Sequence, residues 1–488
     1  MRRTRLTPFL LFAVVFVVQS VSPTPQTGDS RLSAIAAWQL FTHGNLHLEG
    51  YPLVTGLAYQ GDLLPVGGHL VPFFPWPPML LALPGDLIAA ALGHPPTGLS
   101  IASPSLVGFI EVPTASLLVA LTTLVLWRVV LNLPYAWATR RTALIAALTF
   151  AFGTIAWSVG SRALWQQTVS MLLLALSLLV LQRLQRAGSR APAWAALLGV
   201  VLMAAVAARP TNLIFAALVG LWMLVTQRPR TPFVLLGALV AATPFVLFSL
   251  NQYGTLVPPY YYVPTRLTDP PVYGFFESFA LILVSPSRGL LFFVPVVLLA
   301  GLGVWLRIRS RQFTGLDAVL VVAIGAQVVL IAFYGSTGGF TYGPRLLMDV
   351  VPFIVYLALP AIGLLGRRAA PGGGRDAPGA AGRDALVEPA AGPEPSSRKP
   401  LTSRPPERRL VARRVLAGVV VLVLAWGLFV NATGGLMRAA DCWNVTPALV
   451  DAQPERVWDW SDPQFLRPYR DLASGVALRQ VVAGSCTA

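Results

Sequence analysis

The chain has 488 residues, of which 55% are hydrophobic and 11% are charged. About a quarter of the residues of a soluble domain are charged, so this composition excludes a soluble protein and predicts a polytopic membrane protein. The formal net charge of +16 would fit a nucleic-acid partner if the basic residues shared one surface. They occur instead in small clusters at the ends of apolar runs, as the positive-inside rule produces in cytoplasmic loops, so no nucleic-acid partner is expected.

Apolar runs long enough to cross a bilayer predict an all-α fold with about eleven transmembrane helices. These runs are residues 7–22, 106–127, 142–159, 167–182, 193–208, 211–226, 232–250, 289–306, 316–334, 349–366 and 414–432. With the N-terminus in the cytoplasm, this count places every arginine cluster inside and the C-terminus outside. A single missed or added span would invert the rest, so the agreement supports the predicted topology.

The first apolar run follows the basic residues "MRRTR", an order that is also typical of a signal peptide. We favour a retained first helix, because a polytopic protein needs no cleaved signal and no clean A-x-A site follows. In either case the segment after this run emerges on the outer side.

Two shorter apolar stretches are predicted to lie at the membrane surface. Residues 70–92 are interrupted by five prolines, and a crossing there would move Arg140 and Arg141 outside, so the stretch is interpreted as interfacial or re-entrant. Residues 275–286 are too short to span and predict an interfacial half-helix. The outer face therefore carries a large first loop (23–105), with interfacial helices, and a second loop (251–288).

The C-terminal part follows a different pattern. Residues 367–413 are rich in Ala, Gly, Pro and Arg and predict a disordered cytoplasmic linker before the last span at 414–432. The tail from 433 to 488 is predicted to be extracytoplasmic and contains Cys442 and Cys486, which form either one disulfide or two unpaired thiols. We find no internal repeat and no matching pair of interrupted helices of the kind that many secondary transporters show.

Asp29 follows the first span directly, in "TGDS", ahead of an amphipathic stretch at 31–44. A carboxylate held near the membrane surface by a helix and partly desolvated is a candidate general base. The alternative is a structural role, in which Asp29 or Ser30 is the N-cap of that helix. Local sequence leaves both interpretations open.

Several arginines lie at outer helix ends, on the side that the positive-inside rule disfavours, and together they predict an anion-binding outer cavity. They are Arg162, Arg209, Arg288 and Arg345, and the carboxylate of Glu111 lies at the same level. Arg209, at a tight turn in "AARPTN", needs an anionic partner, either a protein carboxylate or a lipid phosphate. The alternative is an arginine that reaches from the interface into water.

All four histidines, His43, His47, His69 and His94, fall in the first outer loop. His43 and His47 have the spacing of a metal pair on one helical face, but Gly44 and Asn45 interrupt the helix between them. We therefore favour hydrogen bonding or substrate contact for the histidines, with solvent exposure as the alternative, and expect no metal site.

Aromatic residues accompany the outer arginines, and Tyr342 in "TYGPR" is one of them. Interfacial aromatic belts explain most such residues in membrane proteins. The remainder are candidates to stack on a sugar ring.

Six short motifs together resemble the bacterial branch of the GT-C superfamily of integral-membrane glycosyltransferases, which includes the protein O-mannosyltransferase-like group. They are "GDS" at 28–30, "PWPP" at 75–78, "RALWQQ" at 162–167, "ARPTN" at 208–212, "SPSRGLLFFVP" at 285–295 and "GGFTYGPRLLMD" at 338–349. The resemblance covers most of residues 1–366, which are interpreted as a GT-C-like catalytic domain. The linker and the tail lie outside it.

The resemblance implies an inverting hexosyl- or pentosyltransferase of a bacterial plasma membrane that takes its sugar from a polyprenyl phosphate, without a metal or other cofactor. By resemblance Asp29 is the general base, and Arg209, Arg288 and Arg345 hold the donor phosphate. Arg162, His69, Tyr342 and Glu111 are further substrate-binding candidates. Many relatives carry two adjacent acidic residues in the first loop, whereas here Ser30 follows Asp29, so the base depends on one carboxylate.

Two other classes of function remain as alternatives. A transporter or flippase of lipid-linked sugars would share the arginine-lined cavity, but it would need access from both sides of the membrane. A non-catalytic scaffold would use the aromatic tail as a binding surface for partner proteins. Neither the sugar nor the acceptor, whether lipid, glycan or protein, follows from the sequence.

Overall fold

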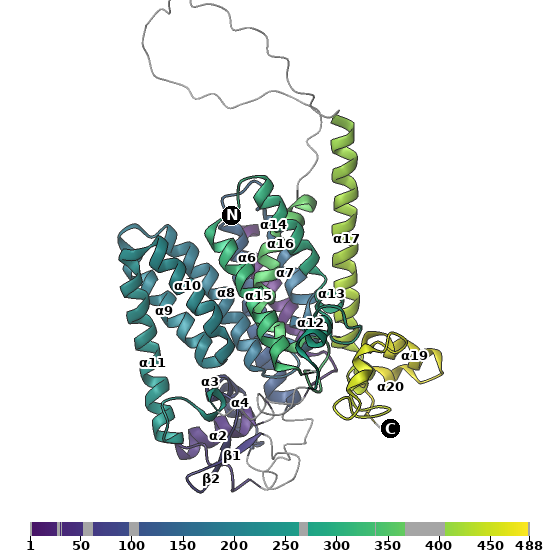
Figure 1. Cartoon of the computed structure of the whole chain (residues 1–488). Coiled ribbons are helices and arrows are strands. Elements are labelled where there is room, and N and C mark those ends of the chain that lie inside the picture. The colour runs from purple at the N-terminus through teal and green to yellow at the C-terminus, as the bar shows by residue number, and fades with distance from the viewer. Residues whose placement is uncertain are drawn as a thin grey trace, which may run out of the picture.

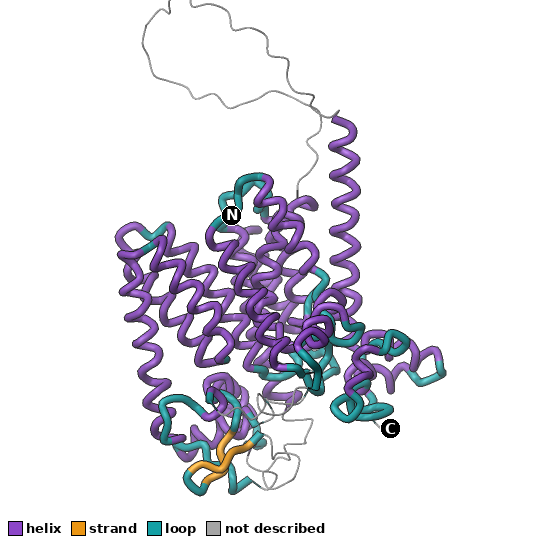
Figure 2. Tube along the Cα trace, in the orientation of Figure 1, coloured by secondary structure: helices purple, strands orange, loops and turns teal. Residues whose placement is uncertain are grey.

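The computed structural model describes residues 2–26, 30, 32–51, 62–96, 107–262, 272–336, 338–366 and 406–486. Within these residues the chain is a bundle of helices with one two-stranded hairpin (Figures 1 and 2). The prediction of an all-α polytopic fold is therefore confirmed, and the small hairpin is an addition that the sequence prediction missed.

Each apolar run that was predicted to span contains one of the longer helices, but two runs are interrupted: the α-helix within 142–159 ends at Phe152, and 289–306 divides into two helices at Val294 and Pro295. These helices are α1 (Arg2–Ser20), α6 (Val112–Leu131), α7 (Arg140–Phe152), α8 (Gln166–Gln185), α9 (Ala191–Ala208), α10 (Leu213–Thr226), α11 (Thr231–Tyr253), α14 (Val296–Arg309), α15 (Gly315–Tyr334), α16 (Val351–Gly366) and α17 (Pro406–Leu436). By length and composition, 7 helical stretches of the described chain can cross a membrane. The helix positions are consistent with eleven spans, and that number stays a prediction.

The shorter elements gather at one end of the bundle (Figure 1). They are α2 (Ser33–His43), β1 (Leu63–Val66), β2 (His69–Pro72), α3 (Trp76–Met79), α4 (Leu83–Ala91), α12 (Phe275–Val284), α13 (Leu290–Phe293), α18 (Arg438–Cys442), α19 (Arg467–Ala473) and α20 (Leu478–Ala483). The proline-rich stretch 70–92 thus forms β2, α3 and α4, and the stretch 275–286 contains α12. Both form short elements rather than long spans, as their sequences indicated.

The predicted topology places the first loop and the tail on one side of the membrane, and the N-terminus and the linker on the other. The two ends of the bundle divide these segments in the same way. The N-terminus and the start of α17 lie at one end, which we call the linker end (Figure 1). The first loop with β1 and β2, and the tail with α19 and α20, lie at the opposite end, which we call the loop end.

The last long helix is longer than predicted. It begins at Pro406, whereas the sequence prediction placed the linker up to 413 and the span from 414. The prediction was wrong for 406–413 because these residues, "PERRLVAR", are too polar to count as a span yet include good helix formers. The polar turns therefore extend the apolar helix on the linker side.

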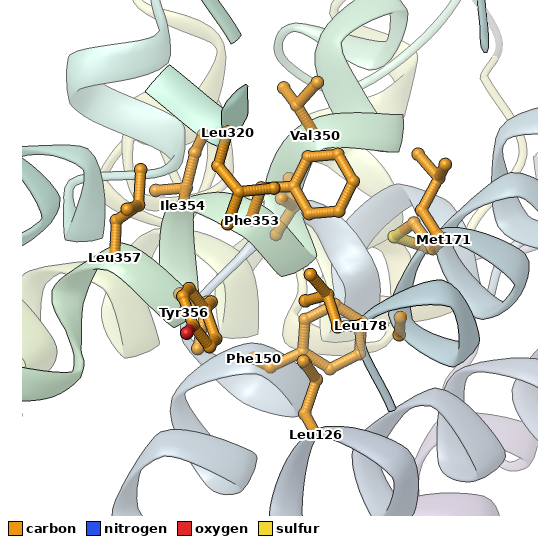
Figure 3. Close-up of a cluster of buried hydrophobic side chains, with 14 of the residues drawn as sticks. Leu126, Phe150, Met171, Leu178, Leu320, Val350, Phe353, Ile354, Tyr356 and Leu357 are labelled. Carbon is orange, nitrogen blue, oxygen red and sulfur yellow. The ribbon is translucent and has the colours of Figure 1, made fainter. Parts of the chain in front are cut away.

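The core of the bundle surrounds α16, whose residues 351–363 are all buried. Figure 3 shows Phe353 and Ile354 of α16 in the same buried cluster as Phe150 of α7 and Leu178 of α8, and all four side chains are fully or almost fully buried. Apolar side chains of this kind pack at close to crystalline density, so α16 is a fixed support for the segment that precedes it.

Glycines allow two helices to approach closely at the edge of the bundle. A Cβ atom at Gly199 of α9 would lie 1.9 Å from the carbonyl oxygen of Val234, and one at Gly237 of α11 would lie 1.8 Å from that of Ala196. Any side chain at either position would push α9 and α11 apart. Small residues at helix contacts are typical of membrane bundles, where close packing takes the place of a hydrophobic driving force.

Candidate functional site

The candidate site is built around residues 338–350, which connect α15 to α16 at the loop end. Three glycines in this segment, Gly338, Gly339 and Gly343, have positive φ angles of 87°, 69° and 72°. Such left-handed conformations favour glycine, and a Cβ atom at Gly343 would also lie 2.6 Å from the ring of Phe293. The turns lead into a 3₁₀ helix at Arg345–Val350, whose first residue and Asp349 are both buried.

Arg209 joins this segment from the end of α9. Its backbone is extended, which ends the helix, and Pro210 begins the next turn. The side chain is 3% exposed, forms an ion pair with Asp349, and donates from Nη1 to the carbonyl oxygen of Leu346 at 3.2 Å. Arg209 thus has a protein carboxylate as its anionic partner, and it lies inside the protein instead of reaching into water.

Arg345 packs against an indole ring from the neighbouring loop. Its guanidinium carbon lies 4.4 Å from the ring centroid of Trp165, and both side chains are buried. The indole N–H donates to the carbonyl oxygen of Val159 at 3.1 Å, which fixes the plane of the ring. A cation over an aromatic face is attracted by the ring quadrupole, most strongly where water is excluded.

We call Trp165, Arg209, Arg345 and Asp349 the arginine site. Arg288 is a neighbour of the arginine site: it lines one small cavity together with Arg345, Ser336 and Gly338. The volume of this cavity is about 20 Å³, which is enough for one water molecule and too small for a sugar. Arg288 and Arg345 thus share the wall of one small cavity with the apolar residues Leu281, Ile282 and Ile331.

Glu111 lies on the other side of the loop that carries Trp165. It ends a short π-helical turn at Val107–Glu111, and its Oε2 accepts a hydrogen bond from the backbone N–H of Leu164 at 3.2 Å. Leu164 and Trp165 are adjacent, so the structure brings Glu111 to the same loop as the arginine site.

Asp86 is a buried carboxylate that the sequence interpretation did not select. It lies on α4, outside the membrane-spanning helices, and is 0% exposed. Among the described residues neither of its oxygens has a hydrogen-bond partner. Burial, with a smaller contribution from the charge of Glu111, raises the pKa of Asp86 to about 8. A lone acidic residue inside the apolar run "LPGDLIAAA" was the signal that could have identified it.

Arg162 binds the end of α1. It is fully buried and donates to the carbonyl oxygens of Gln19 and Ser22, at the end of α1, and to the hydroxyl of Ser161. The last carbonyl groups of a helix lack partners within the helix, and a guanidinium group satisfies them well. These contacts attach α1 to the rest of the bundle.

Arg288 is bound by the C-terminal tail. Its guanidinium group donates to Oε1 of Gln464 at 2.6 Å, to Oδ1 of Asn444 at 2.7 Å and to the carbonyl oxygen of Gly339 at 3.2 Å. The resemblance to GT-C enzymes did not include the tail, but the tail contacts a residue that lines the cavity beside Arg345. Cys442 and Cys486, which form a disulfide, close the tail into a loop.

Tyr342 lies in the core of the bundle. The side chain is 0% exposed, its ring meets Phe293 edge-on, and its hydroxyl donates to the carbonyl oxygen of Val430 in α17 at 2.7 Å. These contacts hold the 338–350 segment against α17. In this arrangement the ring does not face an open surface on which a sugar could stack.

His69 is separate from the arginine site. It begins β2, and its Nδ1 lies 2.5 Å from Oε1 of Glu49, which holds the pKa of Glu49 below its usual value. His47 stacks on His69 and not on His43, because α2 ends at His43 and Gly44 adopts a left-handed conformation, as the sequence suggested.

Asp29, the predicted general base, lies outside the described residues. Its role therefore stays a prediction, and the same holds for its distance from the arginine site.

No protein-family model matches the chain, and no curated protein matches it in sequence. Among solved structures, the chain resembles ArnT from Cupriavidus metallidurans, whose crystal structure was determined bound to undecaprenyl phosphate. The sequences are 16% identical, the TM-score is 0.47, and the match covers 74% of this chain and 60% of that chain.

The match covers less than two thirds of the length of that protein. It does not assign a substrate or a reaction to the chain.

Proposed function

We propose that the protein is an inverting glycosyltransferase that moves a hexose or pentose from a polyprenyl phosphate to a lipid, glycan or protein acceptor at the outer face of a bacterial plasma membrane. The observation that carries this proposal is the arginine site. Arg209 and Arg345 place two buried guanidinium groups at the loop end of an apolar bundle. Buried guanidinium groups are suited to recognise phosphate, and the apolar helices around them are suited to a prenyl chain.

In the proposed reaction, negative charge develops on the leaving group, and this charge has to be stabilised. The acceptor oxygen forms a bond to the anomeric carbon, the bond from that carbon to the phosphate oxygen breaks, and the proton of the acceptor passes to Asp29. The polyprenyl phosphate leaves with additional negative charge. Arg209, which is oriented by Asp349, and Arg345, which is oriented by Trp165, are preorganised to stabilise that charge.

The disulfide supports the proposed orientation. Disulfides persist in oxidising compartments, and Cys442–Cys486 lies in the tail at the loop end. The arginine site and the first loop are at this same end. We therefore propose that the loop end faces outward and that the N-terminus and the linker face the cytoplasm.

The test uses purified protein in lipid nanodiscs with a panel of polyprenyl phosphate sugars and measures the release of prenyl phosphate. We expect release with at least one donor, and its loss in Asp29→Asn with normal expression and insertion. Glu455→Gln, which alters an exposed carboxylate of the tail, is the matched control. Activity retained in Asp29→Asn would remove Asp29 from the mechanism. Movement of the intact lipid-linked sugar across a liposome membrane without release would identify a flippase and overturn the proposal.

A further inference from the structure

The first loop holds a second group of chemically active side chains, His47, Glu49 and His69, which shares no residue with the arginine site. One ligand atom from each residue, an imidazole nitrogen or a carboxylate oxygen, lies within 4.8 Å of the other two. The side chains of Glu49 and His69 are close to half exposed, and His47 is partly buried. The group is therefore accessible from water at the loop end.

The backbone fixes two of these three residues on one side of an extended segment. Leu46 and Leu48 are 1% and 0% exposed, so the alternating residues His47 and Glu49 point away from the core. The N–H of Leu48 donates to the carbonyl oxygen of Leu70 at 2.8 Å, which aligns this segment with β2. The N–H of Leu46 donates to Oε1 of Gln252 at 2.9 Å and ties the segment to the end of α11.

The third residue is placed by the hairpin. Gly67 and Gly68 both have positive φ angles, 60° and 89°, which is the conformation that tight two-residue hairpin turns require. His69 follows this turn and pairs with Val66 in the register of the hairpin. The ring of His69 lies flat against that of His47, with 3.6 Å between the centroids. Three potential ligands thus converge from two backbone segments that are already joined by hydrogen bonds.

We propose that His47, Glu49 and His69 form a binding site for one Zn²⁺ ion. Two imidazoles and one carboxylate are a ligand set that Zn²⁺ accepts, with a fourth position left for water, whereas Mg²⁺ and Ca²⁺ prefer oxygen ligands. Ligands of tetrahedral zinc lie about 2.0–2.2 Å from the ion, so modest rotations of these partly exposed side chains complete the site.

Binding of the ion replaces the hydrogen bond between His69 and Glu49. In the structure Nδ1 of His69 and Oε1 of Glu49 share a hydrogen bond at 2.5 Å. Zn²⁺ takes the place of this hydrogen bond: Nδ1 of His69 and Oε1 of Glu49 bind the ion as a neutral imidazole and a carboxylate, which are the forms that a metal ion requires. The ion then joins the segment that carries His47 and Glu49 to the hairpin, and it stabilises the fold of the first loop without taking part in sugar transfer.

The experiment measures metal content and affinity and does not depend on the proposed activity. The full-length protein, purified with a tag that contains no histidine, is stripped with a chelator and titrated with ZnCl₂ by calorimetry. We expect one Zn²⁺ per chain by mass spectrometry of the metal. Glu49→Gln, His47→Ala and His69→Ala should each weaken binding by about 100-fold or more, since loss of a residue that only orients a ligand already costs about 10- to 100-fold.

His43→Ala and His94→Ala are the matched controls, because both residues lie in the same loop outside the group. Both should bind Zn²⁺ like the unchanged protein. X-ray absorption at the zinc edge of the unchanged protein should show only nitrogen and oxygen ligands with an imidazole signature, which tests the site even if a variant fails to fold. Absence of binding at micromolar free Zn²⁺, or equal binding after loss of His47 or His69, would overturn the proposal.

Discussion

Arg345 lies with its guanidinium carbon 4.4 Å from the ring centroid of Trp165, and the two side chains come from different loops at the loop end. A guanidinium group is planar and stacks on an aromatic face, whereas an ammonium group does so less specifically. The stack therefore sets the orientation of the Arg345 guanidinium group, which we propose as a binding group for the donor phosphate. The sequence motifs "RALWQQ" and "YGPR", which are far apart in the chain, meet in this contact.

The variant Arg345→Lys tests separately how the charge and the orientation of Arg345 affect activity. The variant keeps the positive charge but loses the planar stack, so we expect prenyl phosphate release to be slower. In Arg345→Gln, which also loses the charge, kcat should fall further, by about 100-fold. This is the loss expected when one preorganised donor at a developing charge is removed. Release of prenyl phosphate at saturating donor measures the effect. Arg479→Gln, on the exposed face of α20, is the control and should leave the rate unchanged. Equal activity of Arg345→Gln and the unchanged protein would remove Arg345 from the site.

Because Arg209 and Asp349 form an ion pair, we expect the effects of mutating them on stability to be strongly non-additive. Each side chain is almost fully buried, so removing one leaves the other as an uncompensated charge, at a cost of about 3–5 kcal/mol. We therefore expect Arg209→Met and Asp349→Leu each to lower the melting temperature sharply and the double variant to recover much of the loss. Melting in detergent, followed by tryptophan fluorescence, measures this cycle. A double variant that shows the sum of the two single losses would argue against the pair.

The helices were predictable because their signal is local. The length of an apolar run can be counted directly in the sequence, and for that reason α8, α9 and α15 lie close to the predicted spans. The contacts of Arg209 were only half predictable. Its exclusion from water required an anion, but the choice of Asp349 depends on the glycine turns of 338–350, which the sequence does not place relative to α9.

Other parts of the site depended on contacts between distant segments. By resemblance to GT-C enzymes Arg288 was predicted to hold the donor phosphate, but in the structure Asn444 and Gln464 of the tail bind it, and that resemblance did not cover the tail. Asp86 was missed because it lies in α4, a short helix of the first loop whose burial depends on packing against distant segments. The hairpin was missed because its four-residue strands are too short to show a clear alternation.

Cys442 and Cys486 close a loop with a sequence separation of 44 residues, and this loop contains both tail residues that bind Arg288. A cross-link of this kind restricts the unfolded chain, with a typical contribution of about 2–4 kcal/mol. We expect Cys442→Ser and Cys486→Ser to destabilise the tail equally, and the double variant to be no worse than either. Rates of proteolysis between residues 443 and 485 measure this. A double variant that is cleaved faster than both single variants would mean that the cysteines act independently.

Asp86 predicts a stability that falls as the pH rises. Its folded-state pKa is raised from 3.8 to about 8, so between these values the folded protein keeps a proton that the unfolded chain releases. Stability should therefore decrease from about pH 4 to pH 8 on account of this group and level off above it. Asp86→Asn is neutral at every pH and of similar size, so its melting temperature should change less over this range and exceed that of the unchanged protein at pH 9. Asp459→Asn, an exposed tail variant, should follow the unchanged protein. Parallel curves for Asp86→Asn and the unchanged protein would show that Asp86 is ionised in the fold, and would require a cation or a water-filled contact at this carboxylate.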